Sequence, residues 1–171
     1  MKNAQKDAYN DFGRLLSKGF TQLANVELEW GKAKDCIPQN EVIRSVKALA
    51  KHLGVHLYYS MAGEITEQKP HIHLVVLCKD SDTSRVLEKL QISKIEDFQK
   101  SCKKHSLYWF LEKRNISLAH HTDACGLQYK FAYLAKHESF APLEVACPYR
   151  SQSCRKAIKK KGKCPHGLTY N

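Results

Sequence analysis

Two histidines separated by a single residue, His71 and His73, are the first side chains in this sequence that suggest a chemistry. They begin an alternating, largely apolar run over residues 71–77, a pattern that predicts a β-strand. Because successive side chains of a strand point to opposite faces, both imidazoles are expected on one face, close enough to hold one metal ion. A pair of exposed strand histidines without a ligand is the alternative interpretation of the same motif.

A metal site on a sheet needs a further ligand, and the acidic residues just before the histidines can supply one. Glu64 lies at the end of the preceding predicted strand or in the turn, and Glu67 is the other candidate. Two imidazoles and one carboxylate leave positions for water and substrate oxygens, which suits a catalytic Mn²⁺ or Mg²⁺ and does not exclude Zn²⁺ or Co²⁺. We favour Glu64 as the third ligand, and a solvated hairpin turn is the alternative role for both acids.

A second group of reactive residue types lies in a predicted helix over residues 124–137. At 3.6 residues per turn, Tyr129, Tyr133 and Lys136 share one helix face, and apolar residues occupy the opposite face. A core can therefore be buried without using either tyrosine, which leaves two phenol hydroxyls and an amine for chemistry. Tyrosines packed at a helix boundary with their hydroxyls in water would give the same pattern.

The rest of the sequence predicts the helices and strands that must position these groups. Helical spacing is found over residues 1–20, 41–53, 83–90 and 95–111, and strand-like patterning over residues 26–30, 55–61 and 116–118. Phe20 is the last apolar position of the first helix, and Asn40 and Gly54 are a candidate N-cap and a stop signal for the second. The order of elements predicts an α+β fold in which helices flank a central, mostly antiparallel sheet.

The composition narrows the class of protein. Of the 171 residues 43% are hydrophobic, which is enough to bury a core and argues against wholesale disorder. The 28 Lys and Arg against 17 acidic residues give a net charge of +11, which indicates an anionic partner such as a nucleic acid. Seven cysteines without a C-x-x-C pair, a polar N-terminus and no long apolar segment favour a cytoplasmic protein without a membrane span.

Taken together, His71-Ile72-His73 and the later Tyr133 and Lys136 resemble the motifs of the HUH endonuclease superfamily. The similarity is greatest to the rolling-circle replication initiators of plasmids, phages and small single-stranded-DNA viruses. In that family two histidines around a hydrophobic residue lie on a strand, and a helix with Tyr-x-x-Lys follows. Tyr129 matches the variant with a second tyrosine, whereas the family's first strand motif is matched only loosely, by residues 26–30.

The resemblance implies a fold and an activity. The fold would be an HUH- or RRM-like sandwich over residues 24–140, with an N-terminal helical segment over 1–23 and a basic C-terminal tail over 141–171. The activity would be that of a metal-dependent, site-specific DNA endonuclease with DNA-joining activity, which nicks single-stranded DNA to begin rolling-circle replication.

The same resemblance implies roles for the candidate residues. His71, His73 and Glu64 would hold a divalent metal, Mn²⁺ or Mg²⁺, against the scissile phosphate. Tyr133 would attack phosphorus and form a 5′-phosphotyrosyl linkage. Lys136 would favour the phenolate or the anionic transition state, and Tyr129 would be a second nucleophile or a residue that stacks on DNA.

The implied partner is single-stranded or hairpin DNA at a replication origin. No G-x-x-x-x-G-K-[ST] motif follows, so unwinding would need a host helicase, and copying a host polymerase. A single-strand transposase of the same superfamily and a non-catalytic nucleic-acid-binding module are the alternatives. Conjugative relaxases fit less well because their tyrosine usually precedes the histidine motif.

Two further groups of histidines and cysteines invite a metal-binding interpretation. In the C-terminal segment, Cys147, Cys154, Cys164 and His166 are candidates for structural zinc, although the spacing is atypical. His120 and His121 are adjacent, and on a strand their side chains point apart, so at most one of them can line the pocket of the first site.

Overall fold

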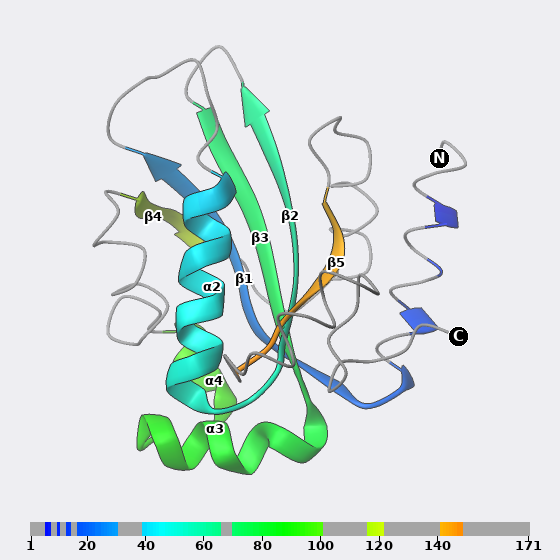
Figure 1. Ribbon diagram of the computed structural model, residues 1–171, viewed down its shortest axis with the longest axis vertical. Coiled ribbons are helices and arrows are strands. Elements are labelled where there is room, and N and C mark those ends of the chain that lie inside the picture. The colour runs from blue at the N-terminus through cyan, green and yellow to red at the C-terminus, as the bar shows by residue number, and fades with distance from the viewer. Residues whose placement is uncertain are drawn as a thin grey trace, which may run out of the picture.

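A five-stranded sheet lies at the centre of the computed structural model, which describes residues 6–7, 10, 13–14, 17–30, 39–65, 70–100, 116–121 and 141–148. The strands are β1 (Phe20–Trp30), β2 (Leu57–Ile65), β3 (Pro70–Lys79), β4 (Ile116–His121) and β5 (Ala141–Ala146). Their order is β4-β1-β3-β2-β5, and every neighbouring pair is antiparallel (Figure 1). The predicted α+β fold with an antiparallel sheet is confirmed.

The middle strand, β3, carries the two histidines at its start. It pairs with β1 on one side and with β2 on the other, and its residues Ile72 to Cys78 are all buried. The run from Leu74 to Leu77 is apolar on both faces, as a strand covered on both sides requires. The histidines therefore belong to the most thoroughly packed strand of the sheet.

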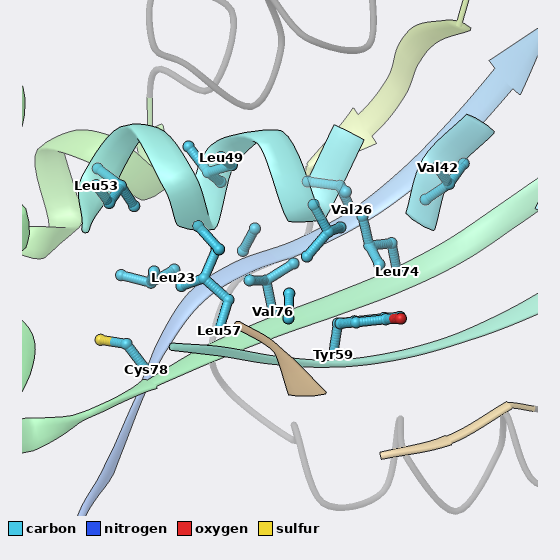
Figure 2. Packing of buried hydrophobic residues seen from close by; sticks show 14 of the residues in the cluster. Leu23, Val26, Val42, Leu49, Leu53, Leu57, Tyr59, Leu74, Val76 and Cys78 are labelled. Carbon is cyan, nitrogen blue, oxygen red and sulfur yellow. The ribbon is translucent and has the colours of Figure 1, made fainter. Parts of the chain in front are cut away.

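Helix α2 (Gln39–Leu53) runs along one face of the sheet (Figure 1). Its apolar side is fully buried in one cluster with side chains of the three central strands, among them Val42, Leu49, Leu53, Leu23, Val26, Leu57, Leu74 and Val76 (Figure 2). The helix ends as the sequence predicts, because Gly54 has a φ of +69° and its N–H donates to the Ala50 carbonyl at 2.9 Å. Asn40 is not the N-cap that the sequence suggests, because the helix already begins at Gln39, one residue before it.

A short 3₁₀ turn, Asp80–Asp82, leads from β3 into α3 (Thr83–Leu90), and α4 (Ile95–Lys100) follows. Helix α3 has the bounds that its periodicity predicts. Asp80 joins this end of β3 to the start of β1, because its N–H donates to the Gly19 carbonyl at 2.9 Å and its carboxylate accepts from Thr21 Oγ1. Gly19 has a φ of +84°, a backbone conformation that a residue with a side chain would adopt only with strain.

The sheet extends beyond both ends of the range predicted for the domain. Phe20 is the first residue of β1 and not the end of a helix, and its ring packs edge-on against Tyr58 at 5.0 Å. At the other end β5 adds residues 141–146 to the sheet through its pairing with β2, so they are not part of a tail. The predicted helix over 124–137 lies outside the described residues. None of the described helices is long and apolar enough to cross a membrane.

Candidate metal centre

The face of the sheet opposite α2 carries polar side chains. We call it the polar face and define it by Asn25, Glu27 and Glu29 of β1, Ser60 of β2, and His71 and His73 of β3. We call the face that α2 covers the core face. Strand alternation produces the two faces, because Val26 and Leu28 or Ile72 and Leu74 point to the core while the residues between them do not.

Pairing between β1 and β3 brings a carboxylate to the two histidines. Glu27 is directly opposite His73, and Glu29 is directly opposite His71. Directly opposed residues of an antiparallel pair have Cβ atoms about 4.5–5.5 Å apart, so their side chains can meet. The register of β1 on β3 thus fixes which acid reaches the histidines.

The side chains of Glu27, His71 and His73 converge. Glu27 Oε1 lies 4.0 Å from His71 Nε2, and Glu27 Oε2 lies 3.9 Å from His73 Nδ1. The imidazole rings are perpendicular, at 89°, with their centroids 4.8 Å apart. The exposed fraction of the side chain rises from 6% for His73 through 12% for His71 to 29% for Glu27, so the cluster is accessible from the carboxylate side.

This cluster fits a divalent metal ion. One ligand atom from each of the three residues lies within 4.8 Å of the other two. Three atoms within 4.8 Å of one another share a central point at most about 2.8 Å from each, so side-chain shifts of less than an ångström bring them to the 2.0–2.2 Å typical of metal bonds to nitrogen and oxygen. Two imidazoles and a carboxylate suit Zn²⁺, Mn²⁺, Fe²⁺ or Co²⁺ and leave positions for other ligands. These residues form a possible metal-binding triad.

The sequence identified the histidines but not Glu27. The alternation Val26-Glu27-Leu28-Glu29-Trp30 places both acids on one strand face, and this was the only available signal. It did not specify which strand β1 pairs with, or in which register. Long-range pairing, which local pattern does not encode, decides that Glu27 faces His73.

The predicted third ligand, Glu64, lies in β2 directly opposite His71, on the side of β3 away from Glu29. Its side chain is outside the described residues, and so is all of Glu67, so Glu64 stays a prediction. Also outside are the predicted catalytic residues Tyr133, Lys136 and Tyr129. Of the predicted zinc ligands Cys147, Cys154, Cys164 and His166, only the half-buried Cys147 is described.

Comparison with known proteins finds no match to a protein-family model, to a curated protein or to a solved structure. The function must therefore be inferred from the chemistry of the metal centre and from the sequence motifs. The geometry supplies a carboxylate and two imidazoles at an accessible position on a sheet, a group that could hold a metal ion.

Proposed function

We propose that this protein is a metal-dependent, single-strand DNA endonuclease and strand transferase that initiates rolling-circle replication of a plasmid, phage or virus. The observation that supports it best is the convergence of Glu27, His71 and His73 within 4.8 Å on one face of an antiparallel sheet. The order of the sequence motifs adds to it, because a tyrosine and a lysine spaced for one helix face follow the histidines.

Charge favours a nucleic acid as the substrate. The chain carries a net charge of +11, and each Lys or Arg that contacts a phosphate adds salt-dependent affinity. Seven basic residues follow the last acidic residue, Glu144: Arg150, Arg155, Lys156, Lys159, Lys160, Lys161 and Lys163. We expect this segment to govern affinity and salt dependence, and Lys136 to govern the rate of the reaction.

The metal centre has a defined part in the reaction. Glu27, His71 and His73 would hold the ion, with Glu64 as a further candidate ligand. A bound divalent cation supplies positive charge that polarises the scissile phosphate and neutralises charge in the transition state. The burial of His73 and its place on the central strand keep the imidazoles in fixed positions, so that little reorganisation is needed during the reaction.

Tyr133 would perform the chemical step. Its phenol oxygen attacks phosphorus, and the bond from phosphorus to the 3′ oxygen of the preceding nucleotide breaks. The phenol proton is lost, and the departing 3′ oxygen gains a proton, which leaves a 5′-phosphotyrosyl link and a free 3′ hydroxyl. Because a phenol with a pKa near 10 is a weak nucleophile at neutral pH, Lys136 would assist by favouring the phenolate.

The reaction can run in reverse, which gives the strand-transfer activity. The phosphotyrosyl ester retains the energy of the bond that was broken, so a 3′ hydroxyl can attack it and reseal the DNA. Tyr129 is placed by sequence on the same helix face as Tyr133 and is the candidate for a second nucleophile in termination. The free 3′ hydroxyl serves as a primer for a polymerase.

Formation of a covalent adduct tests the proposal. The protein is incubated with a library of single-stranded and hairpin oligonucleotides and Mn²⁺ or Mg²⁺, and adducts that survive denaturation are isolated and their ends sequenced. We expect metal-dependent adducts that carry a 5′ phosphate bond to protein and that disappear in Tyr133→Phe. The matched control, Tyr129→Phe, keeps the first cleavage.

Three outcomes would contradict the proposal in different ways. Binding of DNA without any adduct under either metal would identify a non-catalytic module. Adducts lost only in Tyr129→Phe would reverse the assignment of the tyrosines. Adducts restricted to paired hairpins, which are joined to one another and not extended from the 3′ hydroxyl by a polymerase, would identify a transposase.

A further inference from the structure

Helix α2 covers the core face of the sheet, so its outer side points away from the metal centre (Figure 1). The exposed residues of this outer side include three basic ones, Arg44, Lys47 and Lys51. At 3.6 residues per turn, these three side chains lie within about 60° of one another around the helix axis, in a row about 10 Å long. The outer side of α2 therefore presents a row of positive charge to solvent.

Helix α3 extends this row beyond the end of α2. Arg85 Nη1 donates to the Gly54 carbonyl at 3.1 Å, which holds the Arg85 side chain at the C-terminal end of α2. Because a guanidinium has five N–H donors, Arg85 keeps others for a second partner. Lys89 is exposed one helical turn further along α3. The residues that we call the basic face are Arg44, Lys47, Lys51, Arg85 and Lys89.

The basic face carries an excess of positive charge. The acidic residues of the two helices are Glu41, which forms an ion pair with Arg44 at 2.6 Å, and Glu88, which is exposed on α3. Five basic residues against two acidic ones give α2 and α3 together a formal charge of +3. Since Glu41 offsets the charge of Arg44, Lys47 and Lys51 supply most of the attraction that α2 exerts on an anion.

The surroundings of the basic face indicate the kind of anion that it fits. Among the residues of α2 and α3, all of which the structure describes, no exposed residue is apolar and none has a Phe, Tyr or Trp ring. A helix that binds a membrane inserts its apolar side into lipid, but the apolar side of α2 is buried in the core. Protein partners are anchored mainly by aromatic and arginine side chains at a desolvated centre, and single-stranded nucleic acids by aromatic rings on which the bases stack. The phosphate backbone of a duplex requires only positive charge and hydrogen-bond donors.

We propose that the basic face binds the phosphate backbone of double-stranded DNA, an inference that rests on the proposed function for the choice of DNA. Helix α2 is about 10–12 Å across, so the helix and the sheet separate this duplex from a strand at the metal centre. The duplex is therefore the stem of a hairpin that flanks the cleaved strand, and not the strand that is cut. Contacts to phosphates fix the position of the protein on the DNA without reading its sequence.

Fluorescence anisotropy of the full-length protein with a short labelled DNA duplex, over a series of salt concentrations, tests the basic face. We expect Lys47→Gln/Lys51→Gln to weaken duplex binding about tenfold and to lower the slope of log K against log salt by about 2, because each lysine on a phosphate contributes about 0.9. Lys47→Arg/Lys51→Arg keeps both charges and should bind the duplex as the wild type does.

The matched control is Lys6→Gln/Lys18→Gln, which removes the same charge from exposed residues that precede β1. It should keep the wild-type salt slope, and circular dichroism checks the folding of all three variants. An unchanged slope in Lys47→Gln/Lys51→Gln, or an equal decrease in that variant and in the control, would overturn the role of the basic face. A loss of affinity for phosphatidylserine vesicles without a loss for duplex would overturn it in favour of a lipid surface.

The covalent-adduct assay separates this inference from the proposed function. Lys47→Gln/Lys51→Gln should form the adduct with a single-stranded oligonucleotide as the wild type does, because both lysines lie on the side of the sheet away from the metal centre. A wild-type protein that forms no adduct, yet binds duplex through these lysines, would overturn the proposed function alone. A wild-type protein that forms the adduct but does not bind duplex would overturn the basic face alone.

Discussion

Both faces of the central sheet bury apolar side chains, but only the polar face buries polar strand side chains among them. The core face is closed by leucine and valine from α2 and the strands, with Leu49, Leu53 and Leu74 at most 2% exposed. The polar face holds buried Asn25, Ser60 and His73. Ile72 and His73 are neighbours on β3, yet one faces the apolar cluster and the other faces Glu27. Strand alternation thus separates stability from metal binding by a single residue.

Because the faces are separated in this way, we expect a substitution on the core face to lower stability far more than a neighbouring substitution on the polar face. We expect Ile72→Ala to lower the free energy of unfolding by about 2–5 kcal/mol, because it leaves a cavity in a cluster that excludes water. The measurement is urea denaturation in the presence of EDTA. The neighbouring His71→Ala should change the free energy of unfolding by about 1 kcal/mol or less under the same conditions. Equal losses in the two variants would contradict the separation of the faces.

Metal binding should stabilise the protein through the polar face. A ligand that binds only the folded state adds about 2.7 kcal/mol when its free concentration is 100 times its dissociation constant. We expect Co²⁺ or Mn²⁺ to raise the free energy of unfolding by such an amount. EDTA should reverse the increase, and Glu27→Gln should strongly reduce it. The matched control is Glu29→Gln, because Glu29 lies on the same strand face outside the triad. If both variants lose the gain to the same extent, the carboxylate assignment is wrong.

A smaller effect should separate the two acids that the sequence proposed as third ligand. Glu64 is directly opposite His71 in the β2–β3 pairing, and Glu67 follows the end of β2. We expect Glu64→Gln to lower metal affinity about tenfold, as loss of a supporting carboxylate does at other sites, and Glu67→Gln to leave it unchanged. Isothermal titration measures this difference, and an affinity in Glu64→Gln equal to that of the wild type would exclude Glu64 as a metal ligand.

How much of this arrangement the sequence could predict depends on whether a pattern is local. The bounds of α3, the stop at Gly54 and the central position of β3 follow from periodicity and turn chemistry within a few residues. The placing of His71 and His73 on one face is also local, because it requires only strand alternation.

The parts that the sequence did not predict depend on strand pairing. Phe20 continues a helical pattern, but its burial against Tyr58 at the start of β1 outweighs that preference. Glu27 became a candidate ligand only once the register of β1 on β3 was known.

The Tyr59 phenol and the Cys78 thiol lie on the core face. We expect them to leave the free energy of unfolding unchanged at neutral pH and to lower it measurably at alkaline pH. Burial, with a smaller contribution from the Glu144 carboxylate, raises the pKa of Tyr59 from 10.0 to about 12. Burial raises the pKa of the Cys78 thiol from 9.0 to about 12, with Asp82 and Asp80 adding to the rise and a hydrogen bond with Thr83 opposing it. Both groups are neutral when protonated, so the apolar cluster around them favours the protonated form.

The sign of the pH dependence follows from these pKa values. The folded protein keeps both protons at a pH where the unfolded chain has lost them, so the unfolded state gains stability as pH rises from about 9 toward 12. Below pH 9 the two groups leave the free energy of unfolding unchanged.

We expect that free energy to fall with pH above 9, and to fall less steeply in Cys78→Ala, where the thiol that titrates first is absent. Urea titrations at a series of pH values measure the slope, with Cys147→Ala as the control because Cys147 is only half-buried. An identical slope in Cys78→Ala and the wild type would mean that the core face admits water to the thiol, and the contrast between the two faces would then be smaller than their side chains indicate.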